Sequence, residues 1–131
     1  MVKKCNGITC STRHRHTFKS RGSNDIFVAK YNASRYLLWA KVAGGAADDR
    51  AQAVTLMSDG RIAVAGQFHG TDIHFGEDGE EDEVMMSSRT ALSRTIFLAL
   101  YTPDGVLSTA VEAAACGIGM CDVTSIDDEI K

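Results

Sequence analysis

The stretch Asp25–Phe68, DIFVAKYNASRYLLWAKVAGGAADDRAQAVTLMSDGRIAVAGQF, decides the fold of this chain. It contains four short apolar runs separated by turn-forming residues, a pattern that predicts short β-strands joined by hairpins. Asp59-Gly60 lies between two of these runs, and Asp-Gly in that position is the strongest short-range hairpin signal. We therefore predict strands over 26–31, 36–43, 52–57 and 61–68.

The first half of this stretch recurs later in the chain. A shift of 70 positions without a gap aligns Ile26, Phe27, Ala29, Tyr31, Leu37, Ala40 and Ala43 with Ile96, Phe97, Ala99, Tyr101, Leu107, Ala110 and Ala113. Side chains alternate across a strand, so each copy has Ile on one face and Phe, Ala and Tyr on the other. Apolar residues on both faces are typical of strands that are covered on both sides, which we expect for both copies.

These segments resemble the bacterial beta-propeller (SBBP) repeat. DIFVAKY, LLWAKVAGG, the acidic pair Asp48-Asp49, Ser58-Asp59-Gly60 and IAVAGQF stand where that repeat typically reads D-x-F-V-A-K-Y/L, L-x-W-A-K with G-G, an acidic stretch, D/S-G-N and T-G-x-F. The resemblance covers 25–76 and, less closely, 94–114. It implies an all-β fold, an antiparallel meander of propeller-blade type with about one and a half blades, and it transfers no catalytic residues.

The first turn of the chain departs from this repeat, because Arg35 stands where the family usually has a glycine that accepts positive φ. The corresponding turn of the second copy, Pro103-Asp104-Gly105, has the residues that such a turn requires. We also predict that Gly66 allows close approach of a neighbouring strand, and that Trp39 packs between sheets rather than stacking on a ligand.

The chain divides into a basic arm at 1–24, expected to be flexible, and a repeat region at 25–131 with an acidic insertion at about 76–94. Within the repeat region we predict a short edge strand at Thr71–Phe75 and a short helix at Val84–Ser93. No apolar run is long enough for a membrane helix, and no signal peptide is recognisable, although the resembled family is often secreted or surface-attached. The localisation stays open.

Six cysteines and histidines near the two ends of the chain are the candidate metal ligands: Cys5, Cys10, His14, His16, Cys116 and Cys121. Thiolate and imidazole are ligands that zinc prefers, but both cysteine pairs have C-x4-C spacing rather than the common C-x2-C. We therefore expect free thiols and no metal or other cofactor.

For the acidic and histidine side chains elsewhere in the chain, we expect structural or solvent-exposed roles rather than metal binding or catalysis. Asp48 and Asp49 invite a calcium or catalytic interpretation, but neighbours on an extended chain point to opposite sides, so we expect solvated or turn-capping roles. His69, Asp72 and His74 imitate a metal cluster, and a polar loop is the favoured interpretation. The basic arm has neither aromatic residues interleaved with its cations nor a recognition helix, so a nucleic-acid partner is not expected.

A propeller blade functions only in a ring of about 4 to 8 blades. This chain is therefore expected to be an incomplete propeller: a fragment, a degenerate gene remnant or a self-assembling partial propeller. The leading function is a non-enzymatic scaffold or protein-interaction module that binds a protein partner, or itself, through uncovered blade faces. Two alternatives stay open: a metal-binding module that uses the terminal Cys and His residues, and a remnant of a propeller hydrolase or lyase.

Overall fold

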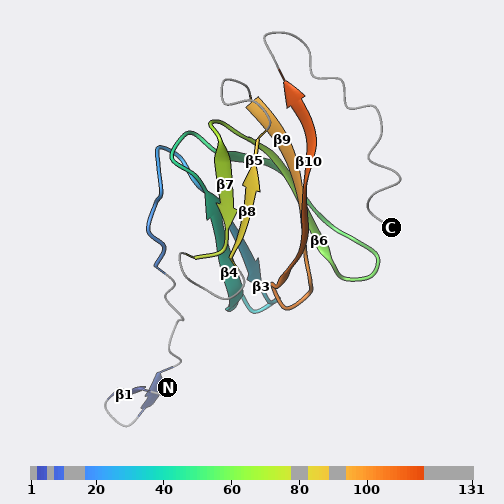
Figure 1. Cartoon of the computed structure of the whole chain (residues 1–131). Coiled ribbons are helices and arrows are strands. Elements are labelled where there is room, and N and C mark those ends of the chain that lie inside the picture. Colours follow the sequence, from blue (N-terminus) through green and yellow to red (C-terminus); the bar gives the residue numbers. More distant parts are fainter. Residues whose placement is uncertain (1–2, 6–7, 11–16, 78–82, 89–93, 117–131) are drawn as a thin grey trace.

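The computed structural model describes residues 3–5, 8–10, 17–77, 83–88 and 94–116, and its secondary structure is entirely β (Figure 1). The strands are β1 (Lys3–Cys5), β2 (Ile8–Cys10), β3 (Ile26–Tyr31), β4 (Leu37–Gly44), β5 (Arg50–Leu56), β6 (Ile62–Phe68), β7 (Asp72–Phe75), β8 (Val84–Ser87), β9 (Arg94–Tyr101) and β10 (Leu107–Cys116). β1 and β2 form a small hairpin, and the other eight strands form two four-stranded antiparallel sheets. The all-β prediction is confirmed.

The two sheets lie face to face (Figure 1). One has the order β3-β4-β7-β8 and the other β10-β9-β6-β5. The three predicted hairpins are present as β3–β4, β5–β6 and β9–β10. The four strands of the opening stretch are divided between the two sheets. β3 and β4 belong to the first sheet, where β4 also pairs with β7. β5 and β6 belong to the second sheet, where β6 pairs with β9 along its whole length.

The hairpin turns follow from their sequences. Gly60 and Gly105 have φ of 87°, the left-handed conformation that glycine adopts at no steric cost. Arg35 has φ of 65° and is the only non-glycine residue with positive φ in the described part of the chain. The side chain of Asn32 holds this turn by accepting a hydrogen bond from the Tyr36 amide at 2.9 Å. Arg35 therefore adopts the left-handed conformation at the position where the resembled repeat usually has glycine.

The hydrophobic core lies between the two sheets and draws on both. Its buried members come from four of the central strands and from β3: Ile26, Ala43, Ile62, Val64, Phe68, Ile73, Phe75, Phe97, Ala99 and Tyr101. Two aromatic contacts join the sheets across this core. Phe75 meets Phe97 edge-on with ring centroids 5.5 Å apart, and Trp39 stacks on Tyr101 at 6.1 Å.

Gly66 allows a close approach of neighbouring groups within the second sheet. A Cβ atom there would overlap the Arg50 carbonyl oxygen and would lie 2.8 Å from the ring of Phe97. The prediction of a close neighbour at Gly66 is confirmed. Trp39 packs between the sheets, as predicted, and its Nε1–H donates to the Pro103 carbonyl at 3.0 Å.

The two copies of the repeat turn opposite faces toward the common core. In β3, Ile26 is buried in the core, whereas Phe27 is 72% and Tyr31 59% exposed. In β9, the equivalent Phe97 and Tyr101 are 1% and 3% exposed and belong to the core. The expectation that both faces are covered is therefore wrong for β3, which lies at a sheet edge with its outer face uncovered.

Two local predictions are also wrong, one just before the acidic insertion and one within it. β7 is not an edge strand, because it pairs with β4 on one side and β8 on the other. Val84–Ser87 forms strand β8 rather than the start of a helix, because pairing with β7 satisfies the backbone of this short segment. Residues 89–93 of the predicted helix lie outside the described residues. None of the described residues forms a helix that could span a membrane.

Candidate functional site

A polar pocket of about 570 Å³ opens where the segment before β3 crosses the loops at one end of the sheets. Its lining comes from three parts of the chain: Lys19, Ser20 and Arg21; Gly45, Ala46 and Ala47; and His69, Gly70, Thr71, Asp72 and His74. The pocket brings His69, Asp72 and His74 to one surface. Whether these side chains could bind a metal ion or a substrate depends on the hydrogen bonds and ion pairs that they already make.

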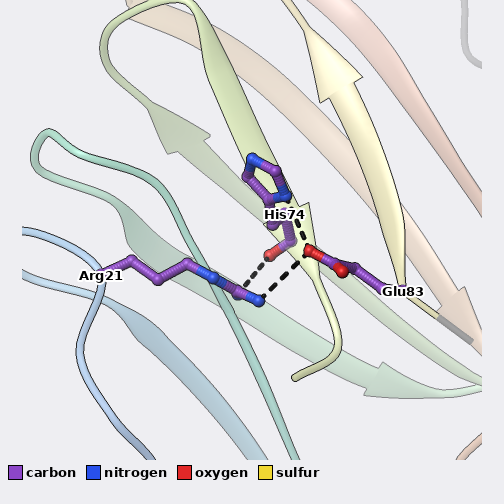
Figure 2. Close-up of polar contacts among 3 residues, drawn as sticks. All are labelled: Arg21, His74 and Glu83. Atoms are coloured by element: carbon purple, nitrogen blue, oxygen red, sulfur yellow. Dashed lines mark hydrogen bonds and ion pairs between the residues drawn. The ribbon is translucent and has the colours of Figure 1, made fainter. Parts of the chain in front are cut away.

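Arg21 is the central cation of this region (Figure 2). Its guanidinium donates to the backbone carbonyl of His74 at 3.3 Å and lies 3.5 Å from the Glu83 carboxylate, and the Arg21 side chain is only 13% exposed. His74 Nδ1 lies 2.9 Å from the same Glu83 oxygen. One carboxylate oxygen is thus contacted by two side chains, and the arrangement ties the segment before β3 to β7 and to the residue before β8.

His69 is engaged through both ring nitrogens. Its Nδ1 lies 3.0 Å from the carbonyl oxygen of Asp48, which can only accept, so Nδ1 carries the proton. Its Nε2 then accepts a hydrogen bond from Arg94 Nε at 3.0 Å. The lone pair that a metal ion or a general base would use is therefore occupied by Arg94.

Two carboxylates, Asp25 and Asp49, flank the Gly44-Gly45 pair. Asp25 accepts a hydrogen bond from the Arg21 amide at 2.6 Å, and Asp49 accepts one from the Gly45 amide at 2.6 Å. Asp25 packs directly on Gly44, where a Cβ atom would overlap it. The Oδ1 atoms of both carboxylates are buried and make no hydrogen bond within the described part of the chain.

Asp48 and Asp49 differ sharply in environment. Asp49 is 1% exposed, and this burial raises the pKa of its carboxyl, against the opposing effect of the Gly45 amide. Asp48 is partly exposed and pairs with Arg50 at 2.9 Å; a hydrogen bond from the Asn24 side chain is the main cause that lowers its pKa. The predicted turn-capping role fits Asp49, and the predicted solvated role fits Asp48.

Three of the six candidate metal ligands lie on described strands. Cys5 and Cys10 lie on the paired strands β1 and β2, Cys116 ends β10, and His14, His16 and Cys121 lie outside the described residues. Across the ranges that the structure describes, no three His, Cys, Asp or Glu side chains are grouped as metal ligands.

A second, smaller opening is mainly apolar and lies between edge strands of the two sheets. An opening of about 290 Å³ separates the edge strands β3 and β5, lined by Phe27, Val28, Ala29, Ala51, Gln52, Ala53, Val54 and Val64. Val54 and Leu56 are 67% and 70% exposed. Large apolar side chains therefore remain exposed on the edge strand β5.

No family model matches the chain, and comparisons with curated proteins and with solved structures also found no match.

Sequence reasoning missed the burial of Asp49 and the clasp formed by Arg21, His74 and Glu83. The clasp joins residues 62 positions apart and had no local signal in the sequence. The burial of Asp49 had a weak one, since the two glycines at 44 and 45 leave room for side chains to pack on the backbone.

Proposed function

We propose that this protein is a non-enzymatic β-repeat module of propeller-blade type, which binds a further β-repeat unit through the outer face of β3. The observation that carries the proposal is the contrast between equivalent residues of the two copies. Phe97 and Tyr101 are buried, whereas Phe27 and Tyr31 are exposed. The same residue types thus face a partner in one copy and water in the other.

The partner of the second copy indicates which surface would suit the first. Phe97 contacts Phe75 of β7, and Tyr101 stacks on Trp39 of β4. A sheet that presents aromatic side chains at comparable positions would therefore cover Phe27 and Tyr31. Covering two large side chains of this kind contributes roughly 1.5–3 kcal/mol each to association, before the entropic cost of binding.

The polar pocket supports the non-enzymatic part of the proposal. Both nitrogens of His69 are engaged, and Glu83 is held by Arg21 and His74. A catalytic site needs a nucleophile or a base with a free lone pair directed at a substrate. In this pocket the polar groups of Arg21, His69 and His74 contact other groups of the protein.

The experiment is site-specific photo-crosslinking of the full chain. Phe27 is replaced by the photoreactive p-benzoylphenylalanine, and Val106, 51% exposed in the turn before β10, receives the same replacement as a control. We expect irradiation to link position 27 to strand residues of a second copy, which supplies further repeat units, well above the level at position 106. Equal crosslinking at the two positions would reject the proposal.

A further inference from the structure

We draw no further inference here: the strongest candidate, the apolar opening between the edge strands β3 and β5, carries no proposal because nothing in the described part of the structure shows what covers it.

Discussion

Trp39 lies against Tyr101 with ring centroids 6.1 Å apart, and so joins β4 of the first repeat copy to β9 of the second. Its indole N–H donates to the Pro103 carbonyl, which also accepts from Lys30. Trp39 therefore holds the β9–β10 turn onto the opposite sheet.

Replacement of Trp39 by Phe should lower the free energy of unfolding by about 1 kcal/mol. The ring contact with Tyr101 is largely kept, and the Pro103 carbonyl keeps Lys30 as a donor. Because Trp39 is the only tryptophan of the chain, urea unfolding should be followed by circular dichroism. Tyr36→Phe, at a residue 52% exposed, is the control and should have no measurable effect. A loss equal to that of Trp39→Ala would show that the hydrogen bond dominates.

The equivalent turn positions Arg35 and Gly105 should respond in opposite directions to exchange. Arg35 has φ of 65°, so Arg35→Gly should stabilise the fold by up to about 1 kcal/mol through relief of left-handed strain. Gly105 has φ of 87°, and an added Cβ would lie 2.6 Å from Trp39, so Gly105→Ala should destabilise it by at least about 1–3 kcal/mol. Thermal unfolding of the two variants checks this, and a change of the same sign in both would contradict it.

The contributions of the neighbours Asp48 and Asp49 to the free energy of unfolding should depend on pH in opposite directions. Burial raises the pKa of Asp49 above the ordinary 3.8, so its ionised form costs stability at neutral pH and this cost disappears as the pH falls through the folded-state pKa. The free energy of unfolding of Asp49→Asn, relative to that of the unmodified chain, should therefore be highest at about pH 7 and lower at about pH 4.

Asp48→Asn is the matched control for this measurement. The pKa of Asp48 is lowered, chiefly by the hydrogen bond from Asn24, so its contribution is present above the unfolded pKa and is lost as the pH falls through the folded pKa. The penalty of Asp48→Asn should shrink toward low pH. Denaturant unfolding over the pH range measures both differences, and parallel curves for the two variants would refute the assignment.

Arg21 should control how firmly the segment before β3 is held. Arg21→Met removes the contacts with the His74 carbonyl and Glu83, so we expect a loss of roughly 1–2 kcal/mol and faster amide exchange in residues 17–25. Lys19→Met, at an exposed residue that lines the same pocket, should change neither quantity. Hydrogen exchange with mass spectrometry distinguishes the two variants, and similar exchange rates would indicate that the clasp is unimportant.

The hairpins could be predicted from the sequence because their causes are local. Asp59-Gly60 and Gly105 supply positive φ where the turns need it, and alternating apolar residues define the flanking strands. The grouping of hairpins into sheets could not be predicted, because it depends on which apolar faces meet. β6 fits beside β9 through Gly66, whose missing side chain admits the Phe97 ring, and this complementarity appears only in three dimensions.

The polar pocket was harder to predict than the strands. His69 and His74 were recognisable as candidate ligands, but their partners Arg94 and Glu83 lie 25 and 9 positions away along the chain. In a chain of β-strands, neither sequence separation predicts that the two side chains meet. The helix predicted to begin at Val84–Ser87 is wrong because the structure of a short apolar segment depends on the strand that it pairs with. Here that strand is β7, which is identified only in three dimensions.

The two copies of the repeat turn opposite faces toward the core, so identical residues at equivalent positions should differ in how well they tolerate substitution. Phe27 and Phe97 occupy matching places in the repeat, yet only Phe97 contributes to the interior. A polar substitution at Phe27 should leave the stability of the fold nearly unchanged, whereas the same substitution at Phe97 should destabilise it. Two positions that are equivalent in the repeat are therefore under different constraints from folding.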